Sequence, residues 1–166
     1  MRCAWLVLLF ASTASADELR PQLQIDGGLS VIGPAYEHPI TKHIAVSVEV
    51  FIFGTYFLPW FDAGEDVKGF GGGVRPTWFA RESGHGLYVA PYFRVVGVDD
   101  ESIGGASGMG FTTGVFVGWA FRLSEKLDLR LGGGAQYIRF RADGPDGQLS
   151  TGTPFVAIDG LLGYRL

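Results

Sequence analysis

The sequence predicts an all-β fold, a closed up-and-down antiparallel transmembrane β-barrel of eight strands. The first observation is that apolar residues alternate with small or polar residues along almost every apolar run after residue 22. The second is that the links between these runs are alternately short and long. The third is that the polar faces carry few charges, with three lysines in the whole chain, whereas the outside of a soluble barrel is densely charged.

Length and composition restrict the class further. The chain has 166 residues, of which 47% are apolar and 18% charged, so it fits one domain and is too apolar to be disordered. Its 26 glycines are roughly twice the usual share of about 7%. A net charge of −4 with scattered basic residues disfavours nucleic acid as a partner.

Residues 1–16 have the three parts of a secretory signal peptide. Arg2 supplies a positive charge, Ala4–Ala11 is an apolar stretch too short to span a bilayer, and Ala14-Ser15-Ala16 forms a small-residue cleavage site. We expect cleavage after Ala16, which leaves residues 17–166 as the barrel domain. Cys3 is the only cysteine, so the cleaved chain would contain neither a disulfide nor a cysteine metal site.

Seven runs have a consistent apolar face, and an even number of strands requires one more. We expect the eighth from the segment Leu19–Tyr36, divided by a tight turn at Asp26-Gly27-Gly28 and bent at Gly33-Pro34. In this segment Leu23, Ile25, Leu29 and Val31 would share one face. The other apolar faces are, in order, Ile44 to Ile52, Phe70 to Trp78, Leu87 to Val95, Phe111 to Phe121, Leu127 to Tyr137 and Val156 to Leu166.

The links predict the orientation of the strands. Short links at 38–42, 81–85 and 122–126 alternate with long ones at 54–66, 97–108 and 141–151, as short periplasmic turns alternate with three long extracellular loops in such barrels. Aromatic side chains near strand ends predict girdles at the two membrane interfaces. The residues expected in the aromatic loop or at an interface are Tyr56, Phe57, Trp60, Phe61, Trp78, Trp119 and Tyr164.

The inward faces would place charged residues in a lumen just wide enough for side chains. Buried charges must pair, so we expect a plug of ion pairs, and a narrow ion-conducting path is the alternative. On this account Glu49→Ala lowers heat resistance, and glycine makes room for large charged neighbours. The expected lumen residues are Glu49, Arg75, Arg94, Asp128, Arg130, Gln136, Asp159 and Arg165.

The chain resembles small bacterial outer-membrane β-barrels of the OmpX, OmpW and OmpA-barrel families. The resemblance rests on the signal segment, the alternating strands and a last strand, Val156–Leu166, that contains Tyr164 and has no aromatic terminal residue. The segments 71–76 and 86–91 also resemble uncharacterised proteins of this group in general pattern, without sharing a defined motif. The resemblance implies Sec-type export to the outer membrane of a Gram-negative bacterium, with outer-membrane lipid and the barrel assembly machinery as partners and with no cofactor.

Two other functional classes would require different features of the sequence. A soluble secreted lipocalin-like barrel binding an apolar ligand would need a wide apolar interior and a charged exterior. A lipid-modifying enzyme, similar to lipid A deacylases and palmitoyl transferases, would need a histidine beside a nucleophilic hydroxyl. We interpret His38, His43 and His85 as solvated turn residues, and the acidic segment 99–101 as a solvated loop tip, so we expect no catalytic or metal site.

Overall fold

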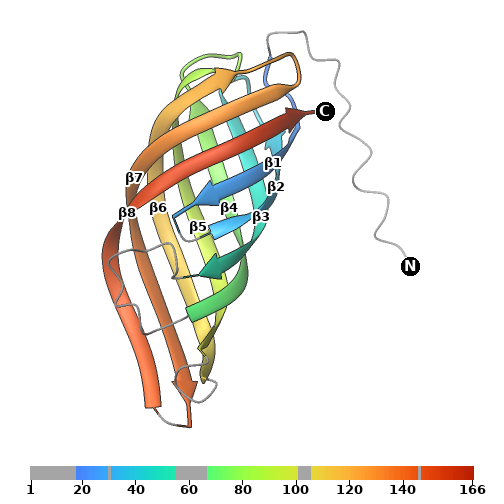
Figure 1. Ribbon diagram of the computed structural model, residues 1–166. Coiled ribbons are helices and arrows are strands. Elements are labelled where there is room, and N and C mark those ends of the chain that lie inside the picture. Colours follow the sequence, from blue (N-terminus) through green and yellow to red (C-terminus); the bar gives the residue numbers. More distant parts are fainter. Residues whose placement is uncertain (1–17, 30, 55–66, 101–105, 146) are drawn as a thin grey trace, which may run out of the picture.

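The computed structural model describes residues 18–29, 31–54, 67–100, 106–145 and 147–166. These residues form a closed barrel in which consecutive antiparallel strands are neighbours and the last strand pairs with the first (Figure 1). The predicted all-β, eight-stranded up-and-down barrel is confirmed. Among the described residues, there is no helix of the length and apolar character needed to cross a membrane.

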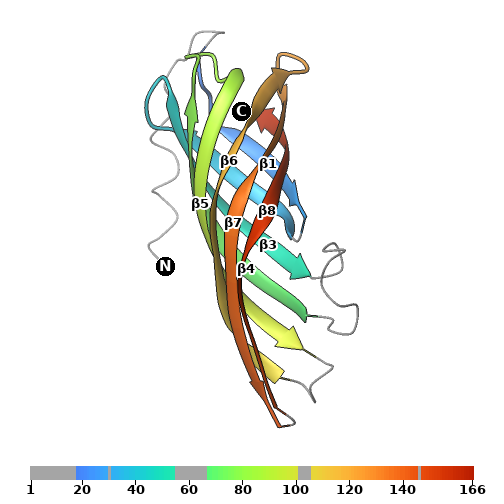
Figure 2. The same ribbon diagram turned by 90° about the vertical axis from the view of Figure 1, so that its left-hand side faces the viewer.

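Strand length increases along the chain, from 7 residues in β1 to 19 in β8. Because β1 pairs with β8, the shortest strand lies beside the longest, and the barrel has one short wall and one tall wall (Figures 1 and 2). The strands are β1 (Gln22–Gly28), β2 (Val31–Pro39), β3 (Ile44–Gly54), β4 (Val67–Phe79), β5 (Gly86–Asp100), β6 (Ala106–Arg122), β7 (Leu127–Gly144) and β8 (Gly147–Arg165).

The first hairpin differs from the predicted one. The segment Asp26–Gly28 is the end of β1 and not a turn, and Asp26 pairs with Gly33 on β2 and Leu161 on β8. The side chain of Asp26 points into the lumen, where two arginines bind it, and this pairing outweighs the turn preference of an Asp-Gly pair. Val31 is buried and does not share the outward face of Leu23 and Ile25.

β2 continues through Gly33-Pro34, where a bend is expected, and its Cα pairing with β3 skips both residues. Gly33 permits close approach of β2 and β3. A Cβ atom at this position would lie only 2.6 Å from the Cα atom of Phe51. Glycine is therefore needed here for its small size rather than for a turn.

Two of the three expected long loops are largely strand. β5 and β6 approach each other until only residues 101–105 separate them, and β7 is joined to β8 through residues 145–146. These segments look like loops because their outward residues are polar, but their inward residues Val98 and Ala142 are apolar and buried. The aromatic residues Tyr56, Phe57, Trp60 and Phe61 lie outside the described residues.

The two faces of the barrel have inverted polarity. Large apolar side chains are exposed on the outer face of every strand, among them Ile52 at 60% and Val117 at 49%. Inside, one apolar cluster contains Phe51 and Phe140 and lies toward the links that join β3 to β4 and β7 to β8. Another contains Phe79 and Tyr88 and lies at the opposite end, toward the short turns. Charged and amide side chains fill much of the remaining interior.

A disulfide across the closing seam tests the closure and its register. Ile25 and Leu162 are Cα partners on β1 and β8 and both point outward, so Ile25→Cys combined with Leu162→Cys should crosslink on mild oxidation. Non-reducing gel electrophoresis detects the crosslink as a mobility shift. Ile25→Cys with Ile158→Cys is the matched control, since Ile158 lies about 13 Å further along the same face of β8. Equal crosslinking of both pairs would contradict this register.

Candidate functional site

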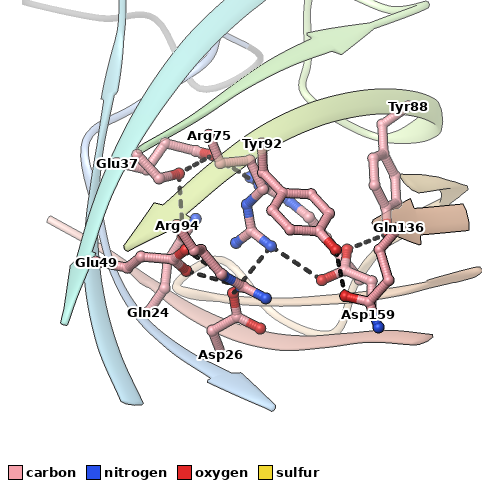
Figure 3. A network of polar contacts seen from close by, with 12 residues as sticks. Gln24, Asp26, Glu37, Glu49, Arg75, Tyr88, Tyr92, Arg94, Gln136 and Asp159 are labelled. Carbon is pink, nitrogen blue, oxygen red and sulfur yellow. Dashed lines mark hydrogen bonds and ion pairs between the residues drawn. The ribbon is translucent and has the colours of Figure 1, made fainter. Parts of the chain in front are cut away.

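Charged side chains form the most distinctive feature of the lumen. Nine of them, contributed by every strand except β6, are no more than 6% exposed. Figure 3 shows Asp26, Glu49, Arg75, Arg94 and Asp159 among them. Five of the nine are carboxylates and four are guanidinium groups. They are Asp26, Glu37, Glu49, Asp128, Asp159, Arg75, Arg94, Arg130 and Arg165.

The central group links strands on opposite sides of the lumen. Arg94 on β5 binds both oxygens of Glu49 on β3, at 2.6 and 3.0 Å, and donates to Asp26 on β1 at 2.8 Å. Arg75 on β4 lies 3.0 Å from Asp26 and 3.0 Å from Asp159 on β8. Because each carboxylate and each guanidinium meets an opposite charge, the buried ions are compensated.

Aromatic side chains hold the central group in position. The guanidinium of Arg94 lies over the ring of Tyr92 at 4.7 Å, and the Tyr92 hydroxyl donates to Gln136 at 2.7 Å. The hydroxyl of Tyr88 donates to Asp159 at 2.5 Å. Cation–π contact and these hydrogen bonds stabilise the buried charges beyond their mutual attraction.

Glu37 and Arg130 form a second, bidentate pair across the lumen, from β2 to β7. The two oxygen–nitrogen distances are 2.6 and 2.7 Å. Ser47 donates to Glu37 at 3.2 Å, and the Arg130 guanidinium lies 4.7 Å from the ring centroid of Phe79. The planar fork of arginine matches a carboxylate in this geometry, which gives strong charge-assisted hydrogen bonds.

A third group lies near the short turns. Arg165 binds both oxygens of Asp128 at 2.7 Å, and Gln22 donates to the same carboxylate at 2.7 Å. His85 approaches Asp128 at 3.4 Å and accepts a hydrogen bond from Arg122 at 3.0 Å. Burial, together with the charge of Arg122, lowers the pKa of His85, which favours the neutral ring that can accept this bond.

The histidine interpretation therefore needs correction. The side chain of His85 is only 14% exposed and is engaged with the ends of three strands, so it is not a solvated turn residue. His38 lies within β2, where its ring is 3.3 Å from the Tyr36 hydroxyl. His43 does lie in a turn, where its Nδ1 atom is 2.9 Å from the carbonyl oxygen of Phe79.

Glycines provide the space that the large lumen side chains occupy. A Cβ atom at Gly118 or Gly132 would lie 2.7 or 2.5 Å from the hydroxyl of Tyr88. At Gly73, it would lie 2.7 Å from atoms of both Arg94 and Glu49. Because such distances are below ordinary contact, these positions exclude any larger residue while the network is in place.

The lumen contains every residue that the alternation assigned to it, and the structure brings Glu49, Arg75, Arg94 and Asp159 into one group. Trp78, Trp119 and Tyr164 lie on the outer face. Sequence reasoning missed Asp26 and Glu37, together with Gln22, Gln24, Tyr88 and Tyr92. Asp26 lies on the same face of its strand as Gln22 and Gln24, which indicates an inward position. The turn-like composition of Asp26-Gly27-Gly28 pointed the other way.

Nothing in the described part of the chain suggests a metal centre, since no group of three or more His, Cys, Asp or Glu residues there could hold an ion. The acidic residues in the lumen face arginines instead. The arrangement can therefore fill and seal an interior, and it holds the strands together through long-range ion pairs.

No protein-family model and no curated protein matches the chain. Among solved structures, it is similar to Neisserial surface protein A (NspA), with a TM-score of 0.56, 13% identity and coverage of 89% of this chain and 95% of that one. The chain has the fold of this small β-barrel. It is equally similar to the N-terminal β-barrel domain of Pseudomonas aeruginosa OprF, with a TM-score of 0.54, 12% identity and coverage of 90% and 98%.

The Glu37–Arg130 pair offers a test of charge compensation. Glu37→Ala leaves a buried guanidinium without its carboxylate and should lower the free energy of unfolding by about 3–5 kcal/mol. Replacing both partners with apolar residues, Glu37→Leu with Arg130→Met, removes both charges and should recover most of that loss. Urea unfolding in lipid vesicles measures both. A double variant less stable than Glu37→Ala would contradict this account of the pair.

Neighbouring glycines on β7 offer a second test. Gly132→Ala should displace the Tyr88 hydroxyl from Asp159 and cost about 1.5–3 kcal/mol, the value of a hydrogen bond to a buried charge. Gly133→Ala is the matched control, because its Cβ atom would point outward and meet only the carbonyl oxygen of Ala157, at 3.6 Å. The same unfolding assay compares the two variants. Equal losses would show that space for Tyr88 is not the reason for glycine.

Proposed function

We propose that the protein is an integral outer-membrane β-barrel protein of structural or surface-interaction type, with a lumen filled by side chains. The observation that carries the proposal is the inverted polarity of the barrel. Outward side chains such as Ile52, Val117 and Phe70 are apolar and 49–65% exposed, whereas nine charges are buried inside. A folded chain in water would not leave so large an apolar surface uncovered, and lipid covers it naturally.

The same observation argues against a soluble lipocalin-like carrier. Such a protein needs an apolar interior for its ligand, and here the interior is bridged by ion pairs such as Glu49–Arg94 and Glu37–Arg130. The outer face would also have to be densely charged, and here every strand exposes large apolar side chains on it. Export with cleavage after Ala16 and insertion by the barrel assembly machinery belong to the proposal, and residues 1–17 lie outside the described part of the chain.

We also propose that the protein is not an enzyme. The histidines make structural contacts: His43 with the carbonyl oxygen of Phe79, His85 with Arg122 and Asp128, and His38 with Tyr36. In the described part of the chain, neither the His43 ring nor the His85 ring is hydrogen-bonded to a serine or threonine hydroxyl. The charged lumen residues neutralise one another and are removed from any surface that a substrate could reach.

An arginine placed on the outer face tests the membrane assignment. Val117 lies in the middle of β6 and points outward, so Val117→Arg should lower stability in vesicles by about 2–4 kcal/mol. Ser107→Arg, near the far end of the same face, is the matched control and should cost at most about 1 kcal/mol. Urea unfolding followed by gel mobility measures both. Recovery of the wild-type protein in the soluble periplasmic fraction would overturn the proposal.

A further inference from the structure

The outer face of β7 changes from apolar to charged beyond a row of aromatic side chains. Phe93 on β5, Phe111 on β6 and Tyr137 on β7 form an outward aromatic row, with ring centroids 6.1 and 6.3 Å apart. The next outward residues of β7 beyond this row are Arg139 and Arg141, both exposed. Aromatic rings favour the boundary between acyl chains and headgroups, so the row places the arginines at headgroup level.

The two arginines differ in their surroundings. Arg141 is already paired with Asp143, at 3.2 Å. Among the described residues, no carboxylate pairs with Arg139, whose Cα partners are Phe111 on β6 and Gly152 on β8. An exposed guanidinium at the edge of an apolar surface is thus available to a ligand that approaches from the membrane side.

A glycine lies beside Arg139 on the neighbouring strand. Gly152 has no side chain, and a Cβ atom there would lie 2.8 Å from the hydroxyl of Tyr137. The Tyr137 hydroxyl therefore leans over the glycine, next to Arg139 and above the aromatic row. A guanidinium fork and a phenolic hydroxyl on one outward surface offer several hydrogen-bond donors to a single anionic group.

We propose that Arg139, Tyr137 and Gly152 form a binding site for the phosphate of an anionic lipid headgroup. Arg139 binds the phosphate oxygens, Tyr137 donates one further hydrogen bond, and the acyl chains lie against Phe111 and Phe93. Charge complementarity and continuity with the apolar outer face favour a lipid over a soluble anion, because a lipid uses both surfaces. The inference rests on the proposed membrane location and specifies which lipid class the barrel selects.

Lipid retention measures this selection. The mature chain is reconstituted in vesicles of equal parts phosphatidylcholine and phosphatidylglycerol, extracted in mild detergent, and the lipid that remains bound is identified by native mass spectrometry. The wild type should retain mainly phosphatidylglycerol. Arg139→Gln should lower the ratio of retained phosphatidylglycerol to phosphatidylcholine by about fivefold, the effect of one basic residue near a lipid surface.

Two further variants make the test specific. Gly152→Ala adds the Cβ atom that displaces Tyr137 and should also lower the ratio. Arg141→Gln is the matched control and should leave it unchanged, because Arg141 is engaged with Asp143. An unchanged ratio in Arg139→Gln, an equal decrease in Arg141→Gln, or no preference in the wild type would overturn the site.

Heat-modifiable gel mobility of the same samples separates this inference from the proposed function. Folded, inserted variants without lipid preference would overturn the lipid site alone. Failure of the wild-type chain to insert into the vesicles would overturn both the site and the membrane assignment.

Discussion

A charged side chain inside a narrow barrel must find a partner, because little water reaches it and an isolated buried ion costs several kcal/mol. In this protein most of the partners come from strands that are not neighbours; the exception is Arg165 on β8, which pairs with Asp128 on β7. Arg94 joins β5 to β1 and β3, Arg75 joins β4 to β8, and Arg130 joins β7 to β2. The pairing therefore fixes how the sheet closes, in addition to compensating the charge.

The glycine content follows from the same constraint. Arginine and tyrosine side chains that enter the interior need space, and nearby strands provide it where a side chain is missing, as at Gly73 beside Arg94 and at Gly132 beside Tyr88. The outer face can then carry large apolar side chains on every strand, because many of the polar groups of the sequence are used inside. Strand pairing around the closed sheet leaves no edge to protect, which is why few lysines are needed.

Much of this arrangement could be predicted from the sequence, since a period of two assigns each residue of a strand to one face. The alternation of Glu49 with Val48 and Val50, for example, indicates its inward position without any knowledge of partners. The partners themselves could not be predicted, because they depend on strand stagger and on which strands face one another across the lumen. The Glu37–Arg130 pair, from β2 and β7, is of this kind.

The sequence-based predictions that were wrong have physical causes as well. Asp26-Gly27-Gly28 has the composition of a turn, yet its aspartate is more strongly stabilised by two buried arginines than by a local turn. Residues 141–151 look like a loop because polar residues such as Arg141 and Ser150 face outward above the aromatic row. Their inward neighbours continue the apolar interior, which only the pairing of β7 with β8 makes visible.

The central claim is that paired charges seal the lumen of a membrane-spanning barrel. Current across a planar lipid bilayer that contains the folded, full-length mature chain tests it most directly. A sealed lumen predicts no current steps above those of the bare bilayer over the range of voltages that the bilayer withstands. Reproducible, protein-dependent steps of uniform size would contradict it, because they would require a continuous water-filled path through the region that Glu49, Arg94, Asp26 and Arg75 occupy.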